Sequence, residues 1–396
     1  MGLMTAHVAT GMPAELDAER RRIDAELARL IAGVRATGPE RDHPLIARVY
    51  GWTRHYLDNG GQRMHGLAVL LAYRACGGQH AALALRVAAA LQLYHHHTLV
   101  HDDVYDEDEA RRGWPTTHRA FADWIEARHG APPDGAPSPT RLFSTEANRR
   151  GAITAFAYGK VCRALAGSAI AGCGAPADTA LAITLALENH DLYDNAAQLA
   201  DVFHEARAMP SPQVCMRNAD LKTGRLFELC AESGARLAGA QASQTQALQD
   251  WAGASALAYQ LQDDLEDLEE ASEKGQGRGV ATDLLHCKPT YLYAMAEQCS
   301  ADDDRAVLQR WRSGVKNDLS TADVMQALHR SGAVQACRAE VARCVARALA
   351  AIDECVPAID ATTAAQMRVF SEHFVSPAYW HRRLPANGHQ ARDLLA

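Results

Sequence analysis

The feature that most constrains the fold is a helical spacing of apolar residues that recurs along most of the chain. Near the N-terminus these residues are 7, 4 and 3 positions apart, at Leu16, Ile23, Leu27 and Leu30. This spacing places them on one face of a helix, and the segment 341–352 repeats the pattern near the C-terminus. Alternating β-branched segments, and Asn-Gly hairpin turns between apolar segments, are typical of strands and are not found. The sequence therefore predicts an all-α protein.

One domain is the simplest organisation for the 396 residues, because no linker separates two cores and no repeat recurs at a fixed period. The strongest loop signal is G-A-P-P-D-G-A-P-S-P-T at 130–140, which has four prolines in eleven residues. We expect a single large helical bundle over residues 1–396, with an inserted Pro-rich loop around 119–150.

Charge and cysteine content limit the partners and the compartment. The formal net charge of −8 disfavours binding to nucleic acid and to anionic membrane surfaces. The ten cysteines include no C-x-x-C pair, which is typical of reduced thiols in a cytoplasmic protein. The sequence begins without a signal-peptide pattern, and no apolar segment reaches the ~18 residues of a membrane span. We expect a cytoplasmic protein with no nucleic-acid partner and no transmembrane segment.

The stretch L-Y-H-H-H-T-L-V-H-D-D-V-Y-D, Leu93 to Asp106, combines histidines with carboxylates. On a helix, Asp102 and Asp106 lie within roughly 20° of His95, while the pair His97 and His101 lies on the opposite side. That pair has a spacing suited to zinc, but no cysteine or obvious third ligand accompanies it. Carboxylates one helical turn apart instead suit Mg²⁺, which prefers oxygen ligands.

A second acidic stretch, Y-Q-L-Q-D-D-L-E-D, repeats the spacing 161 residues later. The first stretch alone is equally compatible with a solvated, acidic helix end. Two D-D-x-x-D segments on two helices are far more specific, because facing carboxylates across a bundle suit two or three Mg²⁺ ions and a diphosphate between them. Arg111 and Arg112 follow the first stretch, and arginine binds phosphate oxygens in a bidentate manner.

With these motifs the chain resembles the all-trans isoprenyl diphosphate synthases, or polyprenyl synthetases, from about Gly60 to Thr290. A-Q-L-A-D at 197–201 is similar to the family's G-Q-x-x-D, and L-K-T-G-R-L-F at 221–227 to its K-T-G-x-L-F. D-L-L-H-C-K-P-T at 283–290 is similar to D-x-x-x-x-K-x-T. The resemblance implies an all-α bundle around a deep apolar cavity, and usually a homodimer.

The resemblance also implies the site residues. The Mg²⁺ ligands would be Asp102, Asp103, Asp106, Asp263, Asp264 and Asp267. The residues that bind the allylic diphosphate would be Arg111, Lys222, Thr223, Gln260, Arg278 and Lys288. Catalysis would depend on the first two aspartates of each motif, Asp106 and Lys222, because metal and lysine stabilise the charge that grows on the departing diphosphate.

The chain departs from the family where the acceptor, isopentenyl diphosphate, is bound. The family has G-G-K-x-x-R-P, whereas this chain has G-G-Q-R-M-H-G, with Gln62 in place of lysine and His65 in place of arginine. His95 and Arg112 are retained, and the helical position of Arg63 should point its side chain elsewhere. Because an amide and a mostly neutral imidazole replace two cations, we expect weak binding of isopentenyl diphosphate.

The leading hypothesis is a Mg²⁺-dependent prenyltransferase that ionises an allylic prenyl diphosphate and transfers the prenyl group to isopentenyl diphosphate or to another acceptor. The alternative is a class I terpene synthase on the same scaffold, which needs no second diphosphate. A third hypothesis is a non-catalytic subunit that modulates a partner synthase, although such a subunit need not retain both aspartate motifs.

Overall fold

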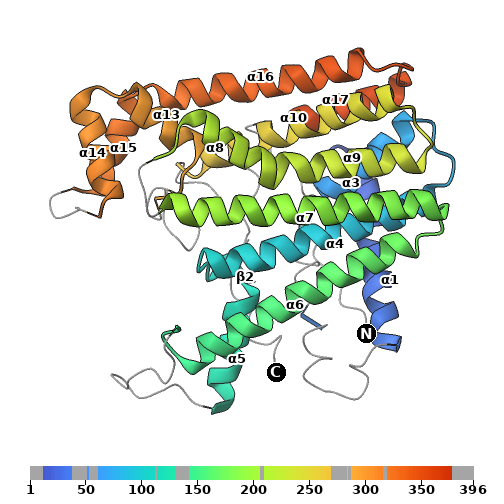
Figure 1. Cartoon of the computed structure of the whole chain (residues 1–396), viewed down its shortest axis with the longest axis horizontal. Coiled ribbons are helices and arrows are strands. Elements are labelled where there is room, and N and C mark those ends of the chain that lie inside the picture. The colour runs from blue at the N-terminus through green and yellow to red at the C-terminus, as the bar shows by residue number, and fades with distance from the viewer. Residues whose placement is uncertain are drawn as a thin grey trace.

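The computed structural model describes residues 12–37, 51–52, 61–111, 114–129, 142–205, 209–268, 283, 287–314 and 319–376. Long helices dominate these residues, which confirms the predicted all-α fold (Figure 1). The helices are α1 (Ala14–Thr37), α3 (Met64–Ala75), α4 (Ala81–Tyr105), α5 (Thr117–His129), α6 (Glu146–Ala171), α7 (Ala177–Glu205), α8 (Pro212–Ala219), the π-helix η2 (Asp220–Gly224), α9 (Arg225–Leu237), α10 (Ala242–Glu266), α13 (Tyr291–Cys299), α14 (Asp302–Arg312), α15 (Thr321–Arg330), α16 (Ala333–Asp353) and α17 (Ala361–His373).

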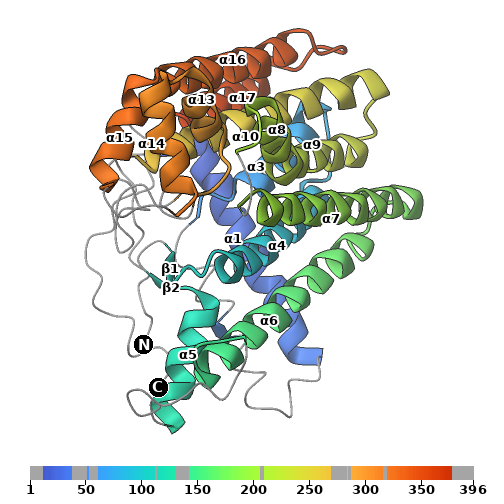
Figure 2. The same cartoon turned by 60° about the vertical axis from the view of Figure 1, so that its left-hand side comes forward.

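A small antiparallel hairpin is the exception to the helical architecture. Strand β1 (Ala110–Arg111) pairs with β2 (Trp114–Pro115), so that Arg111 lies opposite Trp114. In Figure 2 the hairpin lies between the end of α4 and α5. Sequence patterns did not indicate it, because two-residue strands are too short to show an alternation.

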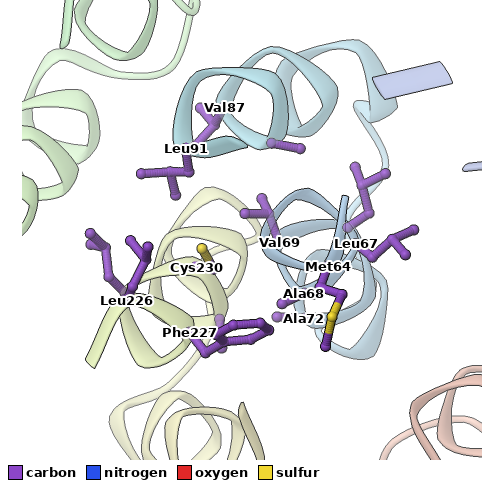
Figure 3. Close-up of a cluster of buried hydrophobic side chains, with 14 of the residues drawn as sticks. Met64, Leu67, Ala68, Val69, Ala72, Val87, Leu91, Leu226, Phe227 and Cys230 are labelled. Atoms are coloured by element: carbon purple, nitrogen blue, oxygen red, sulfur yellow. The ribbon is translucent and has the colours of Figure 1, made fainter. Parts of the chain in front are cut away.

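The core of the bundle lies where α3, α4 and α9 pack against one another, with α10 and α16 beyond them. Apolar side chains from these three helices meet in Figure 3, among them Val69, Leu91 and Phe227. Small residues permit the close approach: a Cβ on Gly234 of α9 would lie 2.3 Å from the carbonyl oxygen of Val69 on α3. This tight packing fixes the relative positions of the helices that carry the predicted site.

A second apolar cluster joins the C-terminal helices to α10. Trp311 of α14, Leu328 of α15 and Cys337 of α16 pack with Leu261 of α10. The N-terminal half of α10 belongs to the first cluster, so this one helix is common to both. The helix that carries the second acidic motif is therefore held on several sides.

Helices occupy both ends of the range 119–150 in which the sequence analysis expected a loop. α5 extends to His129, and α6 begins at Glu146, where the side chain of Thr145 accepts a hydrogen bond from the backbone N–H of Asn148 (3.0 Å). Helix α5 packs closely on α6. The approach is so close that a Cβ on Gly151 would lie 2.3 Å from the His118 carbonyl oxygen. The Pro-rich stretch itself, 130–140, lies outside the described residues.

Among the helices described, none combines the length and the apolar character needed to cross a bilayer.

Candidate active site

The first aspartate motif lies at the C-terminal end of α4. The helix runs without interruption to Tyr105, and the N–H of Asp106 bonds to the carbonyl of Asp102 (2.8 Å). The stretch from Leu93 to Asp106 is therefore helical to its C-cap, and Asp102 and Asp106 lie one turn apart on the same face. His97 and His101 are on the back of the helix, where their rings pack over Gly159 of α6.

Asp103 is fully buried at this helix end and has only half of its carboxylate paired. Nε of Arg111, carried by β1, donates a hydrogen bond to Oδ1 (2.6 Å), while the buried Oδ2 has no hydrogen-bond partner. Burial raises the pKa of Asp103 to about 6, although Arg111 opposes this effect. An unpaired carboxylate oxygen in such a place is available to a further ligand, and a hard cation is one that would satisfy it.

Lys288 reaches the first motif from a distant part of the chain. Its Nζ donates to Oδ2 of Asp106 (2.7 Å), across 182 residues of sequence, and lies 3.7 Å from Oδ1 of Asp283. A predicted diphosphate ligand is thus in direct contact with a predicted metal ligand.

Lys222 belongs to the stretch L-K-T-G-R-L-F, and it links the stretch A-Q-L-A-D at 197–201 to the first aspartate motif. Its Nζ donates to Oε1 of Gln198 (2.8 Å) and to Oδ2 of Asp201 (2.9 Å), both on α7. Burial lowers the pKa of Lys222, but the negative charges of Asp102, Asp201 and Asp106 outweigh burial and leave the pKa raised. Lys222 therefore remains a cation beside the carboxylates.

The backbone around Lys222 adopts a π-helix, η2, a feature that is frequent at functional sites. Gly224 ends it, and a Cβ at this position would lie 2.4 Å from the side-chain oxygen Oδ1 of Asp220. The wider turn is where Lys222 faces α7 and where Thr223 faces α10.

The second aspartate motif is connected to η2 through two hydrogen bonds. The hydroxyl of Thr223 donates to Oε1 of Gln260 (3.0 Å), and Nε2 of Gln260 donates to Oδ1 of Asp264 (3.0 Å). Asp263 precedes Asp264 and is partly exposed. The two motifs therefore approach the same lysine-containing turn from two sides.

Asp267 differs from the other predicted metal ligands. It is 1% exposed, and its Oδ2 accepts a hydrogen bond from the backbone N–H of Asp283 (3.0 Å). In this arrangement one carboxylate oxygen of Asp267 is engaged by the backbone of Asp283. Arg112 and Arg278 lie outside the described residues.

Asp194 is a site residue that the sequence analysis missed. It lies on α7, four residues before Gln198 and seven before Asp201, and so shares their helix face. Burial and then the charge of Asp102 raise its pKa to about 7, although Lys222 opposes them. The spacing of the three polar residues was the available signal.

The raised pKa of Asp194 predicts a stability change with pH. The folded protein keeps this proton up to about pH 7, whereas the unfolded chain loses it near 3.8. The free energy of unfolding should therefore fall as pH rises from about 4 to about 7. Relative to Asp194→Asn, we expect the wild type to lose up to about 4 kcal/mol over this range. Urea unfolding of both proteins in EDTA checks this, and parallel pH profiles would contradict it.

On the acceptor side of the site, the orientation of Arg63 has a different cause from the one expected from the sequence. Arg63 precedes the first residue of α3 in a left-handed conformation (φ 54°), and its Nε bonds to Oδ1 of Asp24 on α1 (2.5 Å). The side chain is thus directed elsewhere, as expected, but by an ion pair rather than by its helical position. His65 is 6% exposed, with its ring centroid 4.0 Å from that of His95 and 4.2 Å from that of Phe227.

Gly66 replaces the family's proline for two visible reasons. Its N–H donates to Oε1 of Gln92 (3.4 Å), a bond that proline has no hydrogen to make. A Cβ at this position would also lie 2.8 Å from Cδ1 of Ile23 on α1. The start of α3 is therefore adapted to this chain's own N-terminal helix.

An all-α bundle with two aspartate motifs around a half-buried lysine defines the class of helical prenyltransferases. The model of the polyprenyl synthetase family matches residues 47–131 and 138–330, and the chain therefore belongs to that family. It is an enzyme that transfers prenyl groups. The gap between the two matched segments, 132–137, falls within the Pro-rich stretch.

Known relatives agree with this assignment. The chain is 28% identical over 278 residues to a farnesyl diphosphate synthase of Geobacillus stearothermophilus, covering 70% of this chain and 82% of the relative. It is 27% identical over 285 residues to a geranylgeranyl diphosphate synthase of Sulfolobus acidocaldarius, covering 71% and 78%. Both are prenyl diphosphate synthases, and neither favours the terpene synthase alternative.

Solved structures share the fold. The structure of geranylgeranyl pyrophosphate synthase from Corynebacterium glutamicum, complexed with isoprenyl diphosphate and magnesium, superimposes with a TM-score of 0.79. It is 22% identical and covers 91% of this chain and 99% of its own. The polyprenyl synthase of Caulobacter crescentus, with calcium and isoprenyl diphosphate, has a TM-score of 0.69 at 21% identity, with 91% and 97% covered.

Proposed function

We propose that this prenyltransferase depends on Mg²⁺ and ionises an allylic prenyl diphosphate, whose prenyl group passes to isopentenyl diphosphate or to another acceptor. The observation that carries the proposal is the convergence of Asp102, Asp106, Lys222 and Lys288 at one end of the bundle. Carboxylates that hold metal, beside lysines that bind phosphate oxygens, are what departure of a diphosphate requires.

The donor set fits magnesium. In the described part of the chain, no three carboxylate, imidazole or thiol groups form a complete metal site. Mg²⁺ is usually held by one or two carboxylates and completes its octahedron with water and substrate phosphates. Asp102, Asp106 and the unpaired Oδ2 of Asp103 would supply the first part, with Asp263 and Asp264 opposite. When bound, Mg²⁺ would neutralise charge on the leaving diphosphate.

The cationic side chains would bind and orient the diphosphate. Lys222 stays protonated because of its carboxylate neighbours, and Lys288 and Arg111 are each held by one aspartate of the first motif. Binding of metal to those aspartates would release the two cations towards the phosphate oxygens. The apolar interior would keep water away from the allylic carbocation.

The test is to incubate the protein with geranyl, farnesyl or geranylgeranyl diphosphate, with and without Mg²⁺ and isopentenyl diphosphate. Diphosphate release and prenyl products are measured separately. We expect release from at least one allylic substrate only when Mg²⁺ is present. No release from any of them with Mg²⁺, or equal release in EDTA, would refute the proposal.

We also propose a homodimer, because α7 exposes an apolar stripe. Its members are each more than half exposed and recur mostly four or seven residues apart: Leu181, Leu185, Leu192, Leu199 and Phe203. The opposite face of α7 packs on α6 and α9, and the helix runs across the front of Figure 1. An exposed stripe of this length marks a protein interface, and a second copy of α7 offers the matching surface.

Leu192→Glu combined with Leu199→Glu should convert the dimer to a monomer, because two charges would be buried at each copy of the stripe. Light scattering after size exclusion gives the mass. Leu142→Glu, which changes a leucine that is 88% exposed outside α7, is the matched control and should stay dimeric. A monomeric wild type, or an unchanged mass in the double variant, would contradict the assignment.

The ten cysteines are all free thiols in the structure, which fits a reducing compartment, and we propose the cytoplasm as the location.

A further inference from the structure

We propose that the acceptor side of this site selects an uncharged acceptor with an O–H or N–H group over isopentenyl diphosphate, and that Asp24 enforces the selection by holding Arg63. The inference deepens the proposed function and rests on it, since an allylic diphosphate must be ionised first. It concerns the residues from Gln62 to Gly66, where two cations of the family are missing.

Arg63 is the cation that could replace them, and it is committed to another partner. The residue is 5% exposed, and its Nε is 2.5 Å from Oδ1 of Asp24. The other oxygen of Asp24 accepts a hydrogen bond from Nη1 of Arg20 (2.7 Å), one turn earlier on α1. A buried arginine cannot leave its carboxylate without a large desolvation cost, so Asp24 keeps this charge away from the acceptor.

The imidazole that replaces the family's arginine is neutral and tightly packed. His65 lies between the rings of His95 and Phe227, and burial, followed by the proximity of His95 and His190, holds its pKa well below the usual value. His190 is buried as well, with no hydrogen-bond partner at either ring nitrogen, and burial lowers its pKa to about 4. His65 and His190 therefore provide hydrogen-bonding nitrogens and no positive charge at neutral pH.

Gln62, which replaces the family's lysine, indicates the class of ligand. Its Oε1 is buried and has no hydrogen-bond partner. A buried carbonyl oxygen without a partner is costly, and only a donor satisfies it. A diphosphate near pH 7 presents acceptor oxygens, which would meet that oxygen with repulsion, whereas a hydroxyl or an amine would donate to it.

The position of His65 and His95 relative to the first aspartate motif suits an acceptor. His95 lies two helical turns before Asp102 on the same face of α4, a rise of ~10 Å along the axis. An acceptor beside His65 and His95 would thus lie next to an allylic chain whose diphosphate is held at Asp102. Phe227 provides the apolar wall, and Figure 3 shows it directed from α9 towards α3.

The transfer step balances without a further reactant. The allylic C1–O bond breaks, and its electron pair leaves with the diphosphate. A lone pair of the acceptor oxygen or nitrogen forms the new bond to C1, and the acceptor's proton passes to a ring nitrogen of His95 and from there to solvent. The products are the prenylated acceptor, diphosphate and a proton.

Two measurements test the proposal. Calorimetric titration with isopentenyl diphosphate does not depend on turnover, and Asp24→Asn should bind it at least tenfold more tightly than the wild type, because Arg63 is released. Asp17→Asn is the matched control, since Asp17 pairs with Arg20 and Arg21 on the same helix and should change nothing. Gln62→Lys, at a partly exposed position, replaces Asp24→Asn if thermal melting shows that the latter is unfolded.

The second measurement is competition during turnover. With an allylic diphosphate and Mg²⁺, the wild type is offered isopentenyl diphosphate together with 3-methyl-3-butenol, phenol and indole. We expect prenylation of an uncharged probe to exceed elongation, and Asp24→Asn to shift the ratio towards elongation through a lower KM for isopentenyl diphosphate.

Dominant elongation by the wild type, or equal affinities in the titration, would overturn the inference. Failure of the wild type to release diphosphate from any allylic substrate would instead refute the proposed function, while the titration would still decide the role of Asp24.

Discussion

Asp102→Ala and Asp263→Ala should each reduce diphosphate release from allylic substrates by at least about a thousandfold, a barrier increase of roughly 4 kcal/mol. Asp102 begins the first motif in the last turn of α4, and Asp263 begins the second motif near the end of α10. Each variant removes an oxygen ligand from one side of the proposed metal-diphosphate complex, and the opposite motif cannot replace it.

The matched control for this prediction is Asp302→Ala. Its side chain is 96% exposed at the start of α14, so the same loss of a carboxylate occurs outside the site. All three variants should keep the helical circular dichroism of the wild type. Near-normal release by Asp102→Ala or Asp263→Ala would show that the paired aspartate motifs do not hold the catalytic metal.

Lys222→Gln should lower diphosphate release by a hundredfold or more, which corresponds to about 3 kcal/mol or more. Lys222 is the half-buried cation between Asp201 and the first motif, and its charge is maintained by three carboxylates. Glutamine keeps most of the length and can still contact Gln198, but it provides no charge for the leaving diphosphate. Preorganised charge at the leaving group is commonly the largest contribution to catalysis in such sites.

Lys160→Gln is the control for that variant, because Lys160 is an exposed lysine on α6. Its release rate should equal that of the wild type. Binding of the allylic diphosphate should weaken in Lys222→Gln alone, which separates loss of the cation from a general loss of charge. If both variants turned over equally fast, Lys222 would be a structural partner of Asp201 and not a catalytic residue.

The sequence by itself determined the fold class and much of the site. Apolar spacing of three, four and seven residues is a local property, and it predicted helices such as α1 and α16 before any contact was known. Each D-D-x-x-D segment lies at the end of a single helix and finishes at its C-cap residue, so its geometry follows from 100° per residue. The spacing of residues in the sequence did not predict where the Pro-rich loop begins and ends, because α5 and the start of α6 depend on packing against each other.

Only the tertiary structure decided which charges meet. The bond between Lys288 and Asp106 spans 182 residues, and no pattern in either segment specifies it. In the sequence Asp194 is one of several polar residues of α7, and only its burial beside Asp102 in the folded protein raises its pKa. The pairing of Arg63 with Asp24 likewise depends on how α1 packs beside α3. Residue chemistry and helical periodicity are encoded locally, whereas burial and charge pairing arise only when distant helices share one core.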